Sequence, residues 1–416
     1  MKIEIKNGKI YGKGEAVSLY IKDGIFVESL DAEADRVIDV DGKAVFPGLI
    51  DAHCHLREPG FEYREDIISG TRSAAKGGFT SVCSMPNTRP VCDNASVVQS
   101  IVSKAKKEAF ANVFPIGAAS KGQDGKELAE YGLMKEEGII AVSDDGKPVL
   151  TADLLRKAML YAADFDLIVM DHCEDLSLGD GAMNEGAVST ELGLRGIPSV
   201  AEDICISRDI ILSEYLDLPI HICHVSTKNG VRMIREAKAR GVKVTAETCP
   251  HYFVLTEEAC RGFNVDAKMF PPLRAEEDRI AVIEGLVDGT VDLIATDHAP
   301  HHADEKDMEF ALSNNGILGL ETAFALSYTW LVKSGLMTIE DMIDTMTRKP
   351  SEILKLGRGD LEIGAPADVA VFDLDNPFIF DKNSMLSKSR NTPFHGYELF
   401  GKTILTICGG KVTYEN

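Results

Sequence analysis

The feature that most constrains the fold is the regular alternation of apolar runs with amphipathic segments. Eight short apolar runs follow one another along the chain, and runs of this length and composition are typical of buried parallel strands. They lie at residues 49–53, 79–84, 113–117, 139–143, 167–172, 220–224, 242–247 and 291–296. The pattern predicts repeated strand–helix units around a parallel sheet.

Most of these runs are followed by a segment with helical periodicity. In residues 227–240, Val231, Ile234 and Ala237 share one face, and charged side chains take the opposite face. Similar segments lie at 66–76, 96–110, 152–163 and 274–287. Eight such units predict an α/β fold of the (β/α)8 TIM-barrel type. The alternative is an open α/β sheet, but no Gly-x-Gly-x-x-Gly motif follows an early run to support a dinucleotide-binding version of it.

Both ends of the chain carry a different pattern, in which short strands are separated by turn residues. Near the N-terminus, Asn7-Gly8 is predicted to form a turn after a first strand. Strands of the same character are predicted at 369–372, 403–407 and 411–414. We expect the two ends to complete one small β-sandwich. This expectation divides the chain into 1–46 and 357–416 for the sandwich and 47–356 for the barrel.

Charge and cysteine content limit the partners and the compartment. The net charge of -22 disfavours nucleic acid and anionic membranes, because both are repelled by a negative field. A small anionic substrate would therefore need a local cation. None of the nine cysteines forms a Cys-x-x-Cys pair, no run of 18 uncharged apolar residues occurs, and the first residues lack an apolar signal core. We expect a cytoplasmic protein with no membrane partner.

Histidine and aspartate residues recur where the predicted strands end. The first run ends in Asp51-Ala52-His53-Cys54-His55, and side chains two apart on a strand point the same way, so both imidazoles face one centre. Other runs end in Ser143-Asp144-Asp145-Gly146, Asp171-His172, His221-Ile222-Cys223-His224 and Thr296-Asp297-His298. The carboxyl ends of barrel strands form the rim on which barrel enzymes build their active sites. Imidazole and carboxylate ligands together suit Zn²⁺ or a similar divalent ion, in a site with one ion or two.

Strand geometry restricts which of these neighbours can act together. Adjacent residues on a regular strand face opposite sides, so only one of Asp144 and Asp145 should point inward. The same holds for Asp297 and His298, and for His221 and His224, which are three apart. Strand geometry leaves the choice within each pair open.

Longer motifs identify a resemblance to a known family. They are Asp51-Ala52-His53-Cys54-His55-Leu56-Arg57-Glu58-Pro59-Gly60, Met85-Pro86-Asn87-Thr88, Ala295-Thr296-Asp297-His298-Ala299-Pro300-His301 and Ser387-Lys388-Ser389-Arg390-Asn391-Thr392-Pro393-Phe394. Together they resemble the type I dihydroorotases of the amidohydrolase superfamily, and the resemblance runs nearly end to end. The segment 361–368 resembles the usual return of that superfamily into the β-sandwich.

The resemblance implies a ligand set for the metals. His53 and His55 would bind the first metal, His172 and His224 the second, Asp145 would bridge the two, and Asp297 would be both a ligand of the first metal and the catalytic base. Related hydantoinases bridge with a carboxylated lysine on the fourth strand. No lysine lies between Gly138 and Gly146 here, which matches the dihydroorotases that use aspartate. The implied cofactor is one or two Zn²⁺ per subunit.

The resemblance also implies how the substrate is held. Arg57, Asn87 and His301 would contact the substrate carboxylate, and a guanidinium is the cation that an anion needs inside a negatively charged protein. Phe270 and Gly316 complete the implied substrate site. The family usually reads Asn-Pro-Pro-Leu-Arg where this chain reads Phe-Pro-Pro-Leu-Arg from Phe270 onward. The amide side chain that would contact the pyrimidine ring is therefore replaced.

The resemblance implies reversible cyclisation of N-carbamoyl-L-aspartate to L-dihydroorotate in de novo pyrimidine (UMP) biosynthesis. One rival is another cyclic-amide hydrolase, an allantoinase or hydantoinase, which Phe270 and the segment 248–252 favour. The other is a catalytically inactive scaffold for a partner enzyme such as aspartate carbamoyltransferase, which would not need a complete ligand set. Implied partners are the small anionic substrate, a further copy of the chain, and that carbamoyltransferase.

Overall fold

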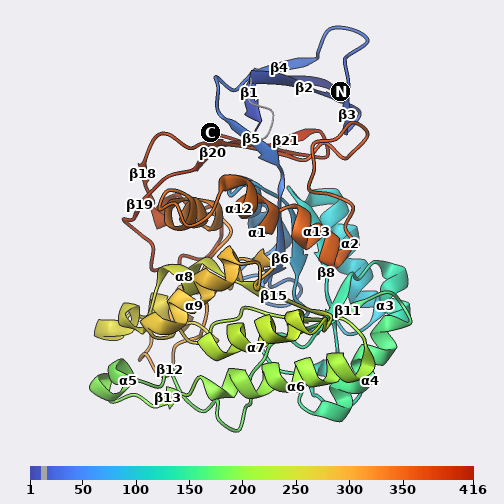
Figure 1. The fold of residues 1–416 in the computed structure, drawn as a ribbon. Coiled ribbons are helices and arrows are strands. Elements are labelled where there is room, and N and C mark those ends of the chain that lie inside the picture. The colour runs from blue at the N-terminus through green and yellow to red at the C-terminus, as the bar shows by residue number, and fades with distance from the viewer. Residues whose placement is uncertain (11–15) are drawn as a thin grey trace.

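The computed structural model describes residues 1–10 and 16–416 and shows a mixed α/β architecture (Figure 1). Each of the eight predicted apolar runs contains a strand. The strands are β6 (Leu49–Cys54), β7 (Phe79–Ser84), β8 (Asn112–Pro115), β10 (Ala141–Ser143), β11 (Ile168–Asp171), β14 (Ile220–Ile222), β15 (Val244–Thr248) and β16 (Leu293–Ile294). Every pair among them is parallel, as expected for strands that helices connect.

The third predicted run, 113–117, is interrupted in the structure. It forms β8 and a separate short strand, β9 (Gly117–Ala118), because the chain changes neighbours at Ile116. β8 pairs with β7, whereas β9 pairs with β10. At the other end of the series, a parallel bridge joins Cys54 of β6 to His298, just beyond β16. The parallel strands thus lie side by side in chain order, and the last of them approaches the first.

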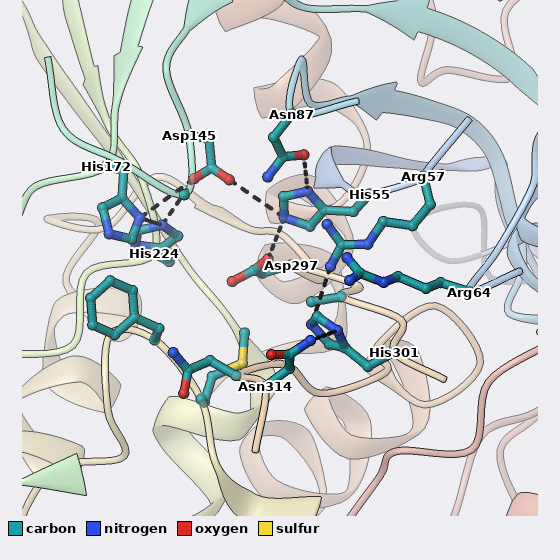
Figure 2. Close-up of a pocket in the computed structure, with 15 residues that line it drawn as sticks. His55, Arg57, Arg64, Asn87, Asp145, His172, His224, Asp297, His301 and Asn314 are labelled. Atoms are coloured by element: carbon teal, nitrogen blue, oxygen red, sulfur yellow. Dashed lines mark hydrogen bonds and ion pairs between the residues drawn. The ribbon is translucent and has the colours of Figure 1, made fainter. Parts of the chain in front are cut away.

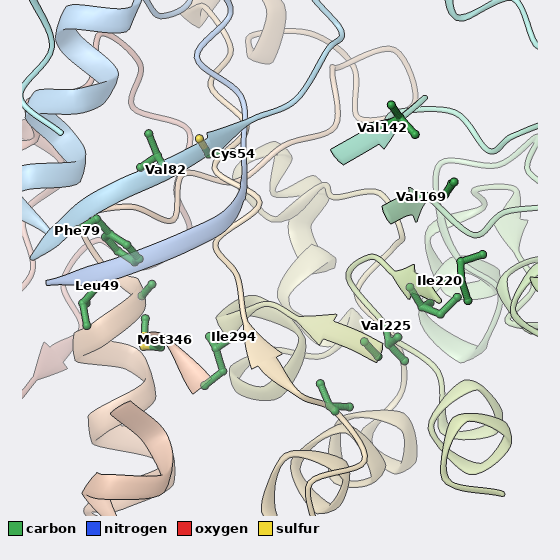
Figure 3. Close-up of a cluster of buried hydrophobic side chains, with 14 of the residues drawn as sticks. Leu49, Cys54, Phe79, Val82, Val142, Val169, Ile220, Val225, Ile294 and Met346 are labelled. Atoms are coloured by element: carbon green, nitrogen blue, oxygen red, sulfur yellow. The ribbon is translucent and has the colours of Figure 1, made fainter. Parts of the chain in front are cut away.

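Helices follow the strands and cover the strand faces that carry the apolar core. They are α1 (Ile67–Lys76), α2 (Ala95–Glu108), α3 (Tyr131–Glu137), α4 (Ala152–Ala163), α6 (Val200–Leu216), α7 (Lys228–Ala239), α9 (Glu276–Val287), α11 (Ala323–Ser327), α12 (Ile339–Thr345) and α13 (Arg348–Leu354). Thr151 and Thr227 cap the N-termini of α4 and α7, and the side chain of each accepts a hydrogen bond from a backbone N–H of the first turn. Figure 3 shows apolar side chains of the strands within this core, among them Val142, Val169 and Ile220.

The two chain ends form one eight-stranded sheet, drawn in blue and red at the top of Figure 1. Its strands are β1 (Lys2–Ile10), β2 (Ala16–Lys22), β3 (Ile25–Val27), β4 (Arg36–Asp39), β5 (Ala44–Pro47), β17 (Val369–Asp373), β20 (Lys402–Cys408) and β21 (Lys411–Glu415). The ends meet where β5 pairs antiparallel with β17. A separate apolar core, which includes Ile5, Phe26 and Val371, lies in this sheet.

The predicted turn at Asn7-Gly8 is wrong. Residues 2–10 form a single strand, and the register of its pairing with β2 shifts between Ile5 and Gly8. Asn7 has a positive φ of 60°, so it occupies a β-bulge inside the strand. The sequence signal marks the left-handed residue but does not distinguish a bulge from a turn.

The remaining regular elements of the described residues are short. They are α5 (Ala187–Leu192), α8 (Pro250–Val254), α10 (Ala303–Lys306), β12 (Met183–Asn184), β13 (Gly196–Ile197), β18 (Phe378–Ile379), β19 (Glu398–Leu399), the 3-10 turns η1 (Lys121–Gln123), η2 (Glu257–Phe263), η3 (Val265–Ala267) and η5 (Lys382–Ser384), and the π-helical turn η4 (Tyr328–Val332). Within the described ranges, no helix combines the length and the apolar character needed to cross a membrane.

Candidate metal centre and active site

Six side chains from different strands meet at the carboxyl ends of the parallel strands. All six are at most 5% exposed. They are His53 within β6, His55 just after it, and Asp145, His172, His224 and Asp297, which follow β10, β11, β14 and β16. These are the six residues that the sequence resemblance assigns to the metals, and the fold brings all of them into one cluster.

Asp145 lies at the centre of the cluster (Figure 2). Its Oδ1 is 3.3 Å from His53 Nε2, 3.3 Å from His224 Nε2 and 3.6 Å from His172 Nδ1. Its Oδ2 is 3.4 Å from His55 Nε2. One carboxylate therefore faces two pairs of imidazoles, the arrangement that a ligand shared by two ions requires.

Asp297 lies on the side of His55 and faces the same space. Its Oδ1 is 3.0 Å from His55 Nε2 and 3.6 Å from His53 Nε2. Asp297 has a φ of 41° and His224 a φ of 36°, both in the left-handed region that non-glycine residues rarely adopt. Backbone strain of this kind is concentrated at functional sites, where surrounding structure holds it.

Two imidazoles are oriented by oxygen acceptors that bind the ring nitrogen facing away from the cluster. His53 Nδ1 lies 2.6 Å from Glu247 Oε1, and His55 Nδ1 lies 2.9 Å from Asn87 Oδ1. Each of these bonds places the proton on Nδ1 and leaves Nε2 as a lone-pair donor toward the cluster. Glu247 was not among the predicted site residues. It ends the seventh apolar run, so its position at a strand end was the available signal.

The electrostatics of the cluster favour cations between its carboxylates. Burial opposes ionisation of Asp145, but the charge of His53 and hydrogen bonds to His172 and His224 outweigh it and lower the pKa of Asp145. The pKa of Asp297 is likewise lowered, against its burial, mainly by His53 and His55. Burial disfavours charge on His172, yet the neighbouring carboxylates of Asp145 and Glu174 raise its pKa to about 10. Positive charge at these positions is stabilised by the anionic centre.

Several buried imidazole nitrogens lack a hydrogen-bond partner within the described part of the chain. They are His53 Nε2, His172 Nε2 and His224 Nδ1 in the cluster, and His251 Nε2 outside it. Two sets of ligand atoms, His53–Asp145–His224 and His53–His55–Asp297, each lie within 4.8 Å of one another. Unsatisfied imidazoles beside carboxylates are the donor set of a divalent transition-metal ion, and these residues therefore suit one.

Strand geometry left open which member of each of three residue pairs faces the site, and in each pair the second candidate points away from the cluster. Asp144 accepts hydrogen bonds from the backbone N–H of Ser120, at 2.9 Å, and from its hydroxyl. His221 lies beneath the cluster, where its Nε2 is 3.1 Å from Glu247 Oε2. His298 lies 3.4 Å from Glu65. In each of the three pairs, only one member reaches the cluster.

Arg57 supplies a buried positive charge beside the cluster. It is 7% exposed, its Nε donates to Pro300 O at 3.1 Å, and its Nη2 lies 3.4 Å from His301 Nε2. No carboxylate of the described residues forms an ion pair with it, whereas the neighbouring Arg64 is paired with Glu305. Burial lowers the pKa of Arg57 to about 10. Burial, together with Arg57 and Arg64, lowers the pKa of His301 to about 2, so His301 is neutral.

These groups open into one cavity of about 380 Å³. Besides the metal-site and carboxylate-site residues already described, its lining includes Arg64, Gly146, Met269, Phe270, Ala299, Asn314 and Asn315. The ring of Phe270 stacks on that of His172, with centroids 5.3 Å apart and 26° between the planes. Gly316 is not part of this lining and packs against Ala299 and His301. Arg64, Asn314 and Asn315 were not predicted, because no local motif marks them.

Comparisons with known proteins agree with this arrangement. Residues 42–230 match the family described as dihydro-orotase-like, and residues 313–414 match the amidohydrolase family. A dihydroorotase from Acetivibrio thermocellus is 56% identical over 95% of this chain and 94% of its own length. One from Ruminiclostridium cellulolyticum is 53% identical over 99% of this chain and 98% of its own length.

Solved structures of similar fold are more distant in sequence. An L-hydantoinase from Arthrobacter aurescens superimposes with a TM-score of 0.89 over 99% of this chain and 96% of its own, at 24% identity. A dihydropyrimidinase from Brevibacillus agri superimposes with a TM-score of 0.86 over 100% of this chain and 95% of its own, at 22% identity. At these identities the likeness concerns the fold alone.

Proposed function

The chain belongs to the dihydroorotase family, and we propose that its cavity catalyses the reversible cyclisation of N-carbamoyl-L-aspartate to L-dihydroorotate. The protein is a metal-dependent hydrolase of the amidohydrolase type. The observation that carries the substrate assignment is the buried guanidinium of Arg57, which has no carboxylate partner among the described residues and lies beside a His/Asp cluster. A buried cation of this kind is stabilised when an anionic ligand binds.

The proposal extends to the fold and to the family subtype. We interpret the parallel strands as one closed (β/α)8 barrel, because they follow one another in chain order and a bridge links Cys54 to His298. We keep the limits 1–46, 47–356 and 357–416 for the two parts of the β-sandwich and the barrel. Asp145 in place of a bridging lysine supports the type I assignment.

The metal that we propose is Zn²⁺, one or two per subunit. His53, His55 and Asp297 would hold one ion, His172 and His224 the other, and Asp145 would bridge the two. When bound, ions of this kind lower the pKa of water and polarise an amide carbonyl. Glu247 and Asn87 hold the Nδ1 protons of His53 and His55, so that both Nε2 atoms remain available as ligands.

Asp297 is the group that we propose to move the proton. Its carboxylate faces the cavity, next to His55, and its lowered pKa keeps it ionised, which is the form that can accept a proton. In the hydrolytic direction, Asp297 takes a proton from the attacking water as the C–O bond forms. It then donates that proton to the ring nitrogen as the C–N bond breaks. Cyclisation follows the same steps in reverse.

Three residues are proposed to hold the substrate carboxylate. Arg57 supplies the charge, and neutral His301 lies against it. Asn87 faces the cavity from the loop that follows β7. Phe270 forms a flat apolar wall against His172. We propose that the ring of the substrate lies against this wall and that Gly316 acts on the site through His301, since a Cβ there would lie 2.7 Å from His301 Cδ2.

A hydantoinase-like activity is the second candidate, and Phe270 is the observation that favours it. An aromatic wall accepts an uncharged cyclic amide as readily as a charged one, whereas Arg57 is useful only for an anion.

We propose that the reaction takes place in the cytoplasm, where nine free cysteines are stable. Association with a further copy of the chain or with aspartate carbamoyltransferase stays a prediction.

Assays in both directions on dihydroorotate, hydantoin and allantoin test the proposal. We expect kcat/KM for dihydroorotate to exceed the other two by at least 100-fold, on the order expected when a buried charge is left without its partner. A preference for hydantoin or allantoin would replace the dihydroorotase assignment by the second candidate. Inactivity on all three substrates with full metal occupancy would favour the alternative of a catalytically inactive scaffold protein.

A further inference from the structure

A loop without regular secondary structure, residues 308–316, forms one wall of the cavity. Asn314 and Asn315 line the cavity from this loop. The loop is partly exposed, and the backbone carbonyls on its inner side need hydrogen-bond donors there, because no helix or strand supplies them. This wall borders the proposed substrate site, so a role for it in binding rests on the proposed function.

Two buried lysines lie behind the loop and bind its carbonyl oxygens. Lys268 Nζ donates to Ala311 O at 3.0 Å and to Ser313 O at 2.7 Å. Lys306 Nζ donates to Asn314 O at 2.8 Å and to Gly316 O at 3.4 Å. Four carbonyls within six residues are thus directed toward two ammonium groups.

Backbone hydrogen bonds also join the loop to the segments that carry the two lysines. Gly316 N donates to Lys268 O at 2.9 Å, and Asn314 N donates to Glu305 O at 3.1 Å, one residue before Lys306. Asn391 Nδ2 also donates to Gly316 O, at 2.9 Å. The two lysines, the backbone of residues 268 and 305 and the side chain of Asn391 therefore form a polar surface against this side of the loop.

Neither lysine has the partner that a buried lysine normally has. Each is 5% exposed, and within the described residues no carboxylate forms an ion pair with either of them. Burial lowers the pKa of Lys268, and it lowers the pKa of Lys306 to about 8. Burying an ammonium without a counterion is costly, so the carbonyl dipoles of the loop must supply the compensation.

The loop connects these lysines to the proposed carboxylate site, of which Figure 2 shows Asn314, His301 and Arg57. Asn314 Nδ2 lies 3.3 Å from His301 Nδ1, and His301 Nε2 lies 3.4 Å from Arg57 Nη2. Because the carbonyl of Asn314 is itself bound by Lys306, the position of its side chain depends on that lysine. A displacement of the loop would change the orientation of His301 beside Arg57.

We propose that Lys268 and Lys306 are positioning residues, which fix the 311–316 wall so that Asn314 orients His301 next to the carboxylate-binding Arg57. They touch neither the substrate nor the proposed metal ligands. Their contribution is to substrate affinity, and the chemical step is left to the metal cluster and Asp297.

The test compares Lys268→Met and Lys306→Met with Lys243→Met in zinc-loaded protein. Lys243 is an exposed matched control, since its Nζ also donates to a backbone carbonyl, Asp217 O, at 2.8 Å. We expect both buried variants to raise KM for dihydroorotate at least tenfold, with kcat within about threefold and metal content unchanged. Hydrogen exchange of amides 311–316, measured without substrate, should accelerate at least tenfold in these two variants alone.

Asn314→Ala provides a second variant that keeps both lysines in place. It should raise KM to a similar extent, and combining it with Lys306→Met should add little further. An unchanged KM in Asn314→Ala, or loss of metal and kcat together in the lysine variants, overturns the positioning role. If wild-type protein loaded with zinc does not convert dihydroorotate, the proposed function fails. In that case the exchange measurement still tests the loop, and unchanged exchange in both lysine variants overturns its anchoring as well.

Discussion

At the scale of single residues, the cluster shows which choices a sequence pattern can make. The i, i+2 spacing places His53 and His55 on one side of a strand, and both side chains reach the cluster. Strand alternation predicts that only one of Asp144 and Asp145 points inward, but it does not say which. That choice depends on where the strand ends relative to Ser120, which binds Asp144, and this is a tertiary contact.

Asp145→Ala should remove metal and activity together, because one carboxylate faces all four imidazoles. Asp144→Ala should keep its metal and lose stability, by about 1–3 kcal/mol, since the backbone N–H of Ser120 and the proton of its hydroxyl lose their acceptor in the interior. Metal analysis and chemical denaturation of the two variants separate these effects. Equal metal loss in both would show that the bridging role is assigned to the wrong residue.

Asp297→Asn removes the group that we propose to accept the proton. We expect kcat to fall on the order of 100-fold or more, the usual scale of general acid–base catalysis. Metal content must be measured beside kcat, since Asp297 also lies 3.0 Å from His55 Nε2. A nearly unchanged kcat with full metal occupancy would place the base elsewhere.

Arg57→Ala removes the buried charge that we propose to bind the substrate carboxylate. Loss of such a partner costs a few kcal/mol, so kcat/KM for dihydroorotate should fall roughly 100-fold or more. The rate with hydantoin should change far less, because hydantoin carries no carboxylate. Arg57→Lys keeps the charge but loses the planar guanidinium, so its kcat/KM for dihydroorotate should lie between that of the wild type and that of Arg57→Ala. Equal losses on both substrates would contradict the carboxylate role.

At the scale of secondary-structure elements, the sequence predicts most boundaries within two residues. The predicted helix 152–163 matches α4, and the predicted strand 79–84 matches β7. Two patterns are misread for the same physical reason. The run 113–117 is split because its end pairs with a different strand, and Asn7-Gly8 forms a bulge because β2 continues to pair beyond it. Pairing partners, and not local composition, decide both.

The contact between the end sheet and the rest of the molecule depends on β17. The ring of Phe372 is fully buried and stacks on that of Phe324, with centroids 3.6 Å apart. Phe372→Ala should lower the free energy of unfolding by about 3–5 kcal/mol, as removal of a buried aromatic ring usually does. Ile379→Ala, on exposed β18, is the control and should change stability by less than about 0.5 kcal/mol. Denaturant titration of both variants measures this, and similar effects would contradict the packing role.

At the scale of the whole molecule, the sequence predicts that the two chain ends join, and the structure shows how. β5 pairs with β17 across more than 300 residues of chain, which places the ends in one sheet and the apolar runs between them in the parallel sheets. Three of the residues that line the cavity from loops are the part that sequence reasoning missed. Arg64, Asn314 and Asn315 reach the cavity through tertiary folding of segments that have no periodicity.

The parallel sheets have their own apolar core, so the fold should survive removal of the metal. Metal-stripped protein should keep its far-ultraviolet circular dichroism spectrum. A large loss of secondary structure on chelation would show that the cluster is needed for folding.

The central claim is that the cluster is a metal centre that turns over dihydroorotate, and a zinc titration of metal-stripped protein tests it most directly. We expect turnover of dihydroorotate to be absent without metal and to rise in proportion to bound Zn²⁺, with saturation at one or two ions per chain. Asp145→Ala protein, titrated in parallel, should neither bind the full complement of zinc nor regain activity. Full turnover in metal-free protein, or saturation with zinc without any turnover of dihydroorotate, would contradict the claim.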